Sequence, residues 1–268
     1  MLHYLKSSVG KLLKRSLFKS SAAGDVVLAN NRYGVYCIPA SHTHRPAAKA
    51  LMAGEVWEPE TIEFIFEYCA AGDLITAGAW AGESLPALCL ATSPDHTVWA
   101  FEPNPESFRF CAATVLLNDL KNVRLLNAAL GDRPDTKNLI VRDCAGLSLG
   151  GACQIIDVAI RDGKSEIEAV AVSVVTIDEV VPNTTAVSII QLDVEGYEEF
   201  ALVGAARTIE MNRPRLILET VPTSGSMAGQ FLDSLGYQIT RRLDSENVLL
   251  ECLDQSKRKY AGPSRGAY

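Results

Sequence analysis

The sequence predicts an α/β fold, in which a mostly parallel, doubly wound sheet carries helices on both faces. Three observations predict this fold class. An apolar strand over residues 74–77 runs through the glycine-rich turn 78–82 into a helix. Strand-like and helix-like segments then alternate along most of the chain. The segment 187–192 is apolar almost throughout, which is typical of a parallel strand covered on both faces.

The length and composition predict one globular domain with appendages. The chain has 268 residues, which is long for one domain and short for two. Apolar residues make up 48% and charged residues 21%, so the chain can bury a sizeable core, and disorder of the whole chain is excluded. No run of about 18 apolar residues occurs, so we expect no membrane-spanning helix.

The charge is distributed unevenly along the chain. The formal net charge is −7, yet residues 1–24 carry five lysine and arginine side chains and no acid, and the tail 254–268 is also basic. The body between them is therefore strongly acidic, which argues against a broad basic face that wraps nucleic acid. We expect no nucleic-acid partner.

The seven cysteines predict neither a metal site nor a redox pair. Their number is odd, and no two of them form a C-x-x-C pair. Most lie in apolar stretches, such as those around Cys69 and Cys89, where a free thiol behaves as a small apolar side chain. A reducing compartment, the cytoplasm, fits this usage best.

Residues 1–20 place leucine and valine at roughly helical spacing, with lysine and arginine between them. A secretory signal needs a continuous apolar core and a small-residue cleavage site, and this segment has neither. Two interpretations of the basic amphipathic segment stay open. One is peripheral contact with a membrane surface, and the other, which we favour, is a helix that packs on the domain or on a partner chain.

Residues 25–72 are expected to form a cap on the domain that follows. Two short extended runs, 26–28 and 35–39, flank Asn and Gly residues and predict a hairpin. Residues 47–52 are predicted to be helical, and Glu58 with the acids after it opens a further helix.

Residues 73–253 are expected to form the core domain. After the first strand and the glycine turn, the predicted elements are helix 83–90, strand 97–101, helix 106–118, strand 123–129, an inserted β meander within 136–175, strand 187–192, a helix to Ile209, strand 215–219, helix 229–235 and a hairpin of 237–241 with 248–252. The meander is predicted from β-like segments at 138–142, 154–160 and 168–175, which have no long helices between them. Five strands of parallel type are thus followed by an antiparallel hairpin.

The second strand of this domain ends at Glu102, which lies 24 positions after Gly78. At about this separation an acid typically accepts hydrogen bonds from both hydroxyls of a ribose. A carboxylate suits the task because it offers acceptor lone pairs side by side. The alternative is an acid that only stabilises the start of the helix 107–117. The spacing favours a nucleotide-like ligand.

Five segments then match one family in order and spacing: LITAGAWAG, VWAFEPNPESF, NVRLLNAALGD, IIQLDVEGYEEFALVGA and RPRLILE. Over roughly residues 25–252 the chain resembles the FkbM family of S-adenosylmethionine-dependent methyltransferases, and the D-x-E-G-x-E segment from Asp193 is the most diagnostic part. The resemblance implies a Rossmann-like, seven-stranded methyltransferase sheet, mostly parallel with an antiparallel C-terminal hairpin. It also implies S-adenosylmethionine as the cofactor and, for most members, a hydroxyl on a sugar or secondary metabolite as the acceptor.

The resemblance also assigns residues to the cofactor site. Gly78, Ala79 and Gly82 would form the turn against the methionine part of the cofactor. Glu102 would bind the ribose hydroxyls. The positions after the third and fourth strands complete the set, with Asn127 and Ala128 beside the adenine and Asp193 facing the sulfonium and the acceptor.

Three positions depart from the commonest pattern of the family. Thr76 stands where an Asp is usual, Trp80 where an Asn or His is usual, and Gln191 where a Lys is usual. Thr76 can still exchange one hydrogen bond, but it removes a charge that would pair with the amino group of the cofactor. We keep Thr76 and Trp80 among the expected cofactor-binding residues.

Methyl transfer to an alcohol is an in-line displacement that benefits from a base, because the hydroxyl proton must leave as the new bond forms. Acids after the fourth and fifth strands are candidates, namely Asp193, Glu195 and Glu219. The cap histidines His42 and His44 are also candidates, because a histidine titrates near neutrality. The set that we carry forward as catalytic is Asp193, Glu195 and His44.

Three functions are weighed. The first is O-methylation of a hydroxyl on a small molecule or saccharide. The second is a nicotinamide-dependent oxidoreductase, which the turn disfavours because it reads G-x-x-x-G rather than G-x-G-x-x-G. The third is a catalytically silent protein that binds the cofactor or a partner, an alternative that Thr76 keeps open. The sequence determines neither the acceptor nor whether the chain forms a homo-oligomer.

Overall fold

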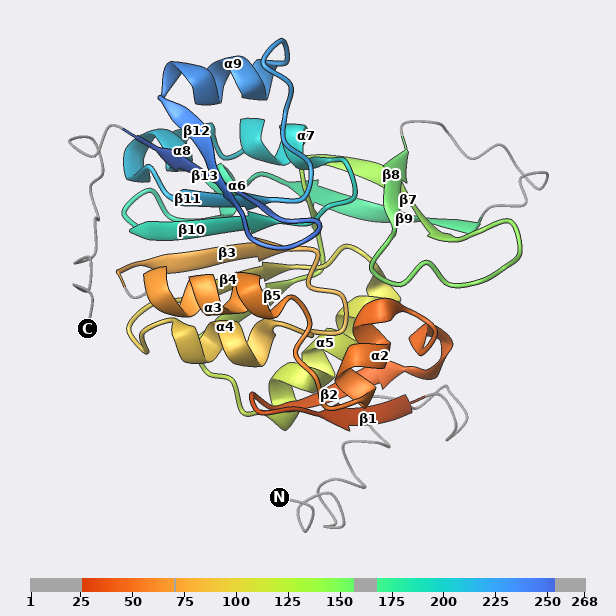
Figure 1. Cartoon of the computed structure of the whole chain (residues 1–268). Helices are drawn as coiled ribbons and strands as arrows, with labels where there is room; N and C mark the ends of the chain where they lie inside the picture. Colours follow the sequence, from red (N-terminus) through yellow and green to blue (C-terminus); the bar gives the residue numbers. More distant parts are fainter. Residues whose placement is uncertain (1–25, 70, 157–167, 254–268) are drawn as a thin grey trace.

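The computed structural model describes residues 26–69, 71–156 and 168–253 of the chain (Figure 1). The predictions made for residues 1–24, for the tail 254–268 and for the end of the β-like segment 154–160 fall outside these ranges. Within the described ranges, no helix is both long enough and apolar enough to cross a membrane.

A seven-stranded sheet forms the centre of the molecule, with the strand order β12-β13-β11-β10-β3-β4-β5. Its strands are β3 (Asp73–Ala77), β4 (Val98–Phe101), β5 (Val123–Leu126), β10 (Val187–Leu192), β11 (Arg215–Leu218), β12 (Tyr237–Arg242) and β13 (Val248–Cys252). The strands β5, β4, β3, β10 and β11 pair in parallel, and β13 lies antiparallel between β11 and β12. The predicted sheet with its antiparallel C-terminal hairpin is confirmed.

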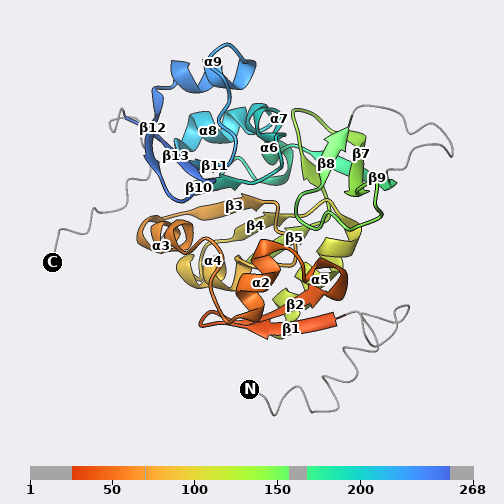
Figure 2. The same ribbon diagram turned by 45° about the vertical axis from the view of Figure 1, so that its right-hand side comes forward.

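Helices cover both faces of this sheet (Figures 1 and 2). On one face lie α3 (Pro59–Tyr68), α4 (Leu85–Ala91) and α5 (Pro105–Leu117), and on the other lie α6 (Ile177–Val180), α7 (Glu198–Val203), α8 (Ala206–Asn212) and α9 (Met227–Ser234). Successive side chains of a strand point to opposite faces. Leu74 therefore packs with the first set of helices and Ile75 with the second, so each layer has its own apolar core.

The predicted N-terminal hairpin and helix are present. The elements are β1 (Val26–Asn30), β2 (Val35–Pro39), the short 3-10 helix η1 (Ala40–His42) and α2 (Pro46–Met52). β1 and β2 pair antiparallel. The backbone N–H of Cys37 in β2 donates to Thr114 Oγ1 of α5 at 3.0 Å, which attaches the hairpin to the core domain.

A second sheet follows β5 and has the order β6-β9-β7-β8. Its strands are β6 (Ala129–Leu130), β7 (Asp135–Arg142), β8 (Gln154–Ile156) and β9 (Glu168–Val175). The inserted β segments are as predicted, but their order is not that of a meander, because β7 lies between β8 and β9 and pairs antiparallel with both. The long β7–β9 pairing buries Leu139, Val141 and Val172 in a core of their own, which favours this order.

The strand predicted over 123–129 is divided between the two sheets. β5 ends at Leu126, and Asn127 turns the chain so that β6 pairs with β9. Asn127 Nδ2 holds this turn by donating to the carbonyl oxygens of Glu102 at 2.8 Å and Pro103 at 3.0 Å. An apolar run does not show where a chain changes sheets, so the prediction of a single strand over 123–129 was wrong.

The helix predicted to reach Ile209 is interrupted as well. Gly204 separates α7 from α8, and a Cβ at this position would overlap the carbonyl oxygen of Gly131. The break lets the helical layer approach the start of the second sheet. Helical periodicity continues across such a break, so the sequence pattern does not reveal it.

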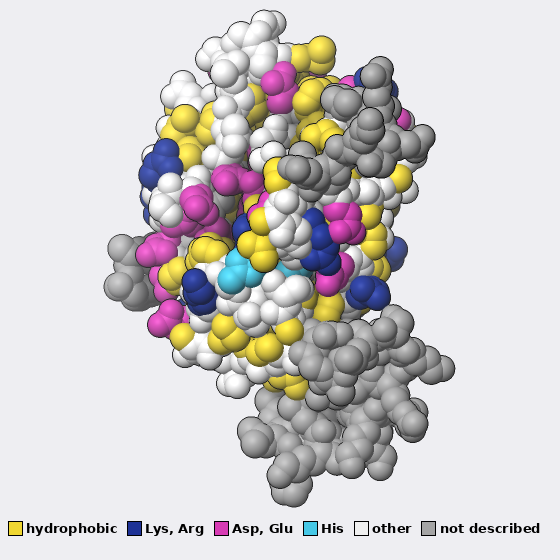
Figure 3. Space-filling view, turned by 90° about the vertical axis from the view of Figure 1, so that its right-hand side faces the viewer, with side chains coloured by type: hydrophobic (Ala, Val, Ile, Leu, Met, Phe, Trp, Pro, Cys, Tyr) yellow, Lys and Arg dark blue, Asp and Glu magenta, His cyan; other side chains and the backbone are white. Residues whose placement is uncertain are grey.

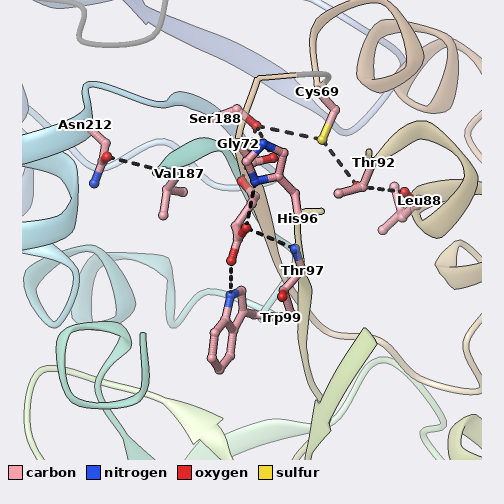
Figure 4. A network of polar contacts seen from close by, with 11 residues as sticks. Cys69, Gly72, Leu88, Thr92, His96, Thr97, Trp99, Val187, Ser188 and Asn212 are labelled. Carbon is pink, nitrogen blue, oxygen red and sulfur yellow. Dashed lines mark hydrogen bonds and ion pairs between the residues drawn. The ribbon is translucent and has the colours of Figure 1, made fainter. Parts of the chain in front are cut away.

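Buried polar groups at the amino ends of the parallel strands partner one another (Figure 4). Asp73 at the start of β3 accepts the backbone N–H of Thr97 at 2.9 Å and Trp99 Nε1–H at 2.7 Å. Ser188 Oγ in β10 donates to the carbonyl oxygen of Gly72 at 3.2 Å. Because these groups have protein partners, we interpret the network as structural.

Candidate functional site

The glycine turn 78–82 joins β3 to α4 at the carboxyl end of the strand. Gly78 and Gly82 have φ angles of 88° and 80°, in the left-handed region that favours glycine. A Cβ at Gly78 would also overlap the carbonyl oxygen of Asp193. Glycine at position 78 therefore allows the carboxyl ends of β3 and β10 to approach each other closely.

Glu102 follows β4 and is only 4% exposed. Its Oε2 accepts the backbone N–H of Trp80 at 2.7 Å, and its Oε1 accepts that of Asn104 at 2.8 Å. Burial raises the pKa of Glu102 to about 8, although these two N–H groups act in the opposite direction. Each carboxylate oxygen keeps a further lone pair, so the side chain is held in place and can still accept hydrogen bonds from a diol.

A cleft opens beside Glu102, between the two sheets. Its lining from the core domain includes Gly78, Phe101, Glu102, Ala128, Asp193, Glu195 and Tyr197, and its lining from the second sheet includes Leu139, Cys153 and Ile155. Much of this lining is apolar, which suits a purine base. The free space between these walls is about 30 Å³.

The structure brings some of the predicted cofactor residues together and leaves others apart. Gly78, Glu102, Ala128 and Asp193 line the cleft. Asn127 is exposed and acts instead on the backbone that follows Glu102, as described above.

Ala79 and Gly82 lie behind the turn rather than in the cleft. Ala79 is buried in the core on the α3–α4 face of the sheet, and its N–H donates to the carbonyl oxygen of Phe101 at 3.1 Å. A Cβ at Gly82 would crowd Thr114 of α5. Both residues shape the turn from the side of the core.

Thr76 and Gln191 are direct neighbours in the pairing of β3 with β10. Thr76 Oγ1 donates to Gln191 Oε1 at 3.4 Å. Two of the three departures from the family pattern thus face each other, and a neutral pair stands where that pattern would set an Asp opposite a Lys. A change of both partners leaves no buried charge unpaired.

A larger cavity of about 320 Å³ adjoins the cleft at Gly78 and Asp193. We call it the acidic cavity, because its charged lining consists of Arg45 and the six carboxylates Glu58, Glu83, Asp193, Glu195, Glu219 and Glu246. Trp57 and Trp80 add aromatic surface. Acidic side chains gather on this face of the molecule, close to the histidines (Figure 3).

The carboxylates of the acidic cavity raise one another's pKa. Burial, followed by Glu219 and Glu58, raises the pKa of Asp193 well above its ordinary value. Burial and Glu219 raise the pKa of Glu195 to about 7, whereas Arg45 lowers it. A carboxyl group that titrates near neutrality can take up a proton and release it again during a reaction.

The two cap histidines have different surroundings. His42 is fully buried; its Nδ1 accepts Trp80 Nε1–H at 2.9 Å, and its Nε2 lies 2.6 Å from Ser148 Oγ. His42 therefore carries its proton on Nε2 and connects the glycine turn to the loop of the second sheet. His44 is exposed and lines neither the cleft nor the acidic cavity.

Replacing His42 by alanine should destabilise the protein by about 2 to 4 kcal/mol at pH 7, because Trp80 Nε1 and Ser148 Oγ each lose a buried partner. Burial lowers the pKa of His42 from 6.5 to about 4, so the unfolded state binds the proton more tightly. The contribution of neutral His42 to the free energy of unfolding is therefore lost as the pH falls from about 6.5 towards 4. Urea unfolding of both proteins at pH 7 and pH 4.5 measures the change.

The exposed neighbour provides a matched control for this prediction. His44→Ala should change the free energy of unfolding by about 0.5 kcal/mol or less. A penalty for His42→Ala that is the same at pH 7 and pH 4.5 would contradict a neutral, buried His42.

The sequence analysis missed five residues that line the acidic cavity: Arg45, Trp57, Glu58, Glu83 and Glu246. Glu58 and Glu83 stand just before helices and therefore look like acids that stabilise a helix start. Glu58 has a φ of 49° and makes no side-chain cap hydrogen bond, and Glu83 Oε2 is buried without a hydrogen-bond partner among the described residues. Glu83 therefore has an oxygen that can serve a ligand, whereas the side chain of Glu58 has Asn247 as a hydrogen-bond partner.

These residues suit a cofactor with a nucleoside at one end and positive charge at the other. The cleft offers an acceptor for a diol and apolar walls. Glu83 offers a buried carboxylate oxygen that has no hydrogen-bond partner among the described residues. S-adenosylmethionine has the complementary groups, which are a ribose, a sulfonium and an ammonium.

Comparisons with solved structures return several methyltransferases. The methyltransferase FkbM from Methylobacillus flagellatus KT aligns at a TM-score of 0.46 and 20% identity, over 67% of this chain and 43% of that one. A SAM-dependent methyltransferase from Aquifex aeolicus aligns at a TM-score of 0.41 and 14% identity, over 74% and 91% of the two chains. M. jannaschii TYW2 in complex with AdoMet aligns at 0.39 and 12%, over 87% and 89%. The chain spans less than half of the M. flagellatus protein.

The comparison with family models is more specific. No curated protein matches the chain. A model described as the methyltransferase FkbM domain matches residues 77–239, from the end of β3 into β12, which is more than half of the chain. The matched part contains the glycine turn, Glu102 and Asp193. The chain therefore belongs to the FkbM family of methyltransferases, which use S-adenosylmethionine.

Proposed function

We propose that this protein methylates a hydroxyl group on a sugar, a glycan or a secondary metabolite. The observation that carries the proposal is the position of Asp193, which lines both the cleft and the acidic cavity. An acceptor in the acidic cavity would lie next to the end of the cleft, where the cofactor supplies an electrophilic methyl group when bound. The chain's own residues would then hold the acceptor and take up its proton.

The lining of the acidic cavity supports a polyhydroxylated acceptor. Carboxylates accept hydrogen bonds from hydroxyl groups, and the flat apolar surface of tryptophan suits a sugar ring. A volume of about 320 Å³ is within the range of small-molecule sites. The excess of carboxylates disfavours phosphorylated or carboxylated acceptors, and nucleic acid as well, by charge repulsion.

Glu195 is our candidate for the base that takes the hydroxyl proton. It lines both the cleft and the acidic cavity. Its pKa of about 7, raised by burial and by Glu219, keeps a carboxylate that is both populated and basic near neutral pH. Asp193 is the alternative, because it lies at the same junction. A catalytic role for His44 stays a prediction, and the contacts of the described residues do not support it.

Replacing Glu195 by glutamine should lower kcat about 100-fold, because an amide cannot take up the proton. The affinity for S-adenosylhomocysteine should change little. In the wild type, kcat/KM should rise with pH up to about 7 and then level off, since the deprotonated form of Glu195 is the active one. Transfer of a labelled methyl group, measured from pH 5.5 to pH 8.5, tests both expectations.

The variant should lose the rising limb of the pH profile that the wild type shows. Glu199→Gln, in the following helix α7 and outside both linings, is the control and should keep that limb. A Glu195→Gln enzyme with the wild-type profile would exclude Glu195 as the base.

The function itself is tested by titration calorimetry followed by an acceptor screen. We expect micromolar affinity for S-adenosylmethionine and S-adenosylhomocysteine, about −8 kcal/mol, and no binding of NADH. A panel of neutral sugars, matched sugar phosphates and hydroxylated metabolites then receives labelled cofactor. Binding without turnover on any acceptor would favour the catalytically silent alternative, and binding of NADH alone would favour the oxidoreductase.

We also propose that the protein works in a reducing compartment. All seven cysteines are free thiols, which supports a reducing compartment such as the cytoplasm.

A further inference from the structure

Glu83 has a buried carboxylate oxygen that the rest of the described chain leaves unused. It is the residue directly after the glycine turn and lies two positions before α4. Its Oε2 is enclosed and has no hydrogen-bond partner among the described residues. A buried carboxylate oxygen without a donor costs free energy, so its presence points to a partner that is absent from the chain itself.

The side chain faces a small cavity that continues from the cleft. This cavity is lined by Trp57, Thr76, Gly78 and Gln191 together with the carboxylates Glu58, Glu83 and Asp193. Gly78 and Asp193 also line the cleft. A ligand whose ribose is bound at Glu102 and which extends past Gly78 would therefore reach Glu83.

The charged groups around the small cavity favour the binding of a cation. Its lining contains three carboxylates and no lysine, arginine or histidine. The neighbouring pair Thr76 and Gln191 is neutral and its members bond to each other, so it supplies no positive charge. Burial raises the pKa of Glu83 well above its usual value, with Glu58 and Glu102 adding to the rise and its own backbone N–H opposing it. A bound cation would relieve this crowding of carboxyl groups.

We propose that Glu83 is the ammonium-binding residue of the cofactor site, and that its unpaired oxygen accepts a hydrogen bond from the α-ammonium of the methionine portion. This inference rests on the proposed use of S-adenosylmethionine. It also explains how the site works without an acid at position 76, because Thr76 and Glu83 line the same cavity and the negative charge is supplied from the start of α4 instead of from β3.

The test is a comparison of two proteins with two ligands by titration calorimetry. The proteins are the wild type and Glu83→Gln. The ligands are S-adenosylhomocysteine and its analogue that lacks the α-amino group, and neither carries the sulfonium charge. The wild type should bind S-adenosylhomocysteine roughly 10- to 150-fold more tightly than the analogue, as expected for one charge-assisted hydrogen bond.

The variant should lose this preference. Glu83→Gln should bind S-adenosylhomocysteine roughly 10- to 150-fold more weakly than the wild type does, and should bind the analogue as the wild type does. An equal loss with both ligands, or no loss with either, would overturn the proposal. Glu60→Gln, an exposed acid in the first turn of α3, is the control and should keep the wild-type preference.

Two further measurements distinguish a failure of the ammonium site from a loss of stability and from a failure of the proposed function. Thermal unfolding without ligand should show Glu83→Gln to be at least as stable as the wild type, because the change removes a carboxyl group that is crowded by Glu58 and Glu102. If the wild type binds neither S-adenosylhomocysteine nor S-adenosylmethionine, the proposed function fails first and the ammonium site with it. If the wild type binds both ligands equally, the function stands and the ammonium site is wrong.

Discussion

Glu102→Ala is expected to weaken the binding of S-adenosylhomocysteine roughly 100-fold to 10,000-fold. The ribose hydroxyls would lose two hydrogen bonds to the ionised carboxyl group, each of which contributes about 1.5 to 3 kcal/mol, less the cost of ionising a group whose pKa is about 8. The backbone N–H groups of Trp80 and Asn104 would also lose their acceptor, so the glycine turn would be held less firmly. Titration calorimetry measures the affinity, and urea unfolding without ligand measures the structural part.

A comparison of ligands separates the two contributions to the Glu102→Ala effect. Adenosine should lose affinity for the variant, whereas 2′,3′-dideoxyadenosine should bind the two proteins more nearly alike, because it has no hydroxyls for Glu102 to accept. Glu210→Ala, an exposed acid of α8, is the control. Unchanged affinity in a folded Glu102→Ala protein would remove Glu102 from the cofactor site.

Gly78→Ala is expected to cost at least about 4 kcal/mol of stability and to abolish cofactor binding. The new Cβ would overlap the carbonyl oxygen of Asp193, and the φ of 88° would be strained for alanine. The overlap is with backbone, so no side chain can rotate away. The ends of β3 and β10 would have to separate, which would move Asp193 away from the turn. Urea unfolding and calorimetry with S-adenosylhomocysteine measure both effects.

Gly236→Ala separates the steric overlap from the strain of a positive φ. Gly236 has a φ of 76° and nothing within 4 Å of an added Cβ, so its substitution should cost only about 1 kcal/mol. A Gly78→Ala protein that is no less stable than Gly236→Ala would show that the two strand ends are not held together as the structure has them. Failure of Gly78→Ala to fold, with a stable Gly236→Ala, would agree with the overlap.

The order of the main strands and the glycine turn could be predicted because their signals are local. A strand covered on both faces is apolar along its length, and β10 shows this pattern. The predicted single strand over 123–129 and the predicted single helix to Ile209 were wrong. In each case one continuous sequence pattern covers two separate elements, which are divided at Asn127 and at Gly204. In both places the decision depends on a contact with a distant segment, with the carbonyl of Glu102 in one case and with Gly131 in the other.

Part of the candidate site could be predicted for the same reason. Gly78 and Glu102 lie at a spacing that the strand–turn–helix unit imposes, so their neighbourhood follows from the chain order. The family resemblance predicted that Ala79 and Asn127 lie beside the cofactor, but their contacts are with the core and with backbone carbonyls. Position along the chain indicates which turn a residue belongs to and not which side of the turn it faces.

The local sequence was sufficient for the parallel sheet, the glycine turn and the family. Packing in three dimensions alone placed the acidic cavity, the neutral pairing of Thr76 with Gln191 and the unpaired oxygen of Glu83. The physical reason is that burial and charge repulsion depend on neighbours in space. The carboxylates that crowd Asp193 come from the start of α3, from the end of β11 and from the segment after β10, and no local pattern records that they meet.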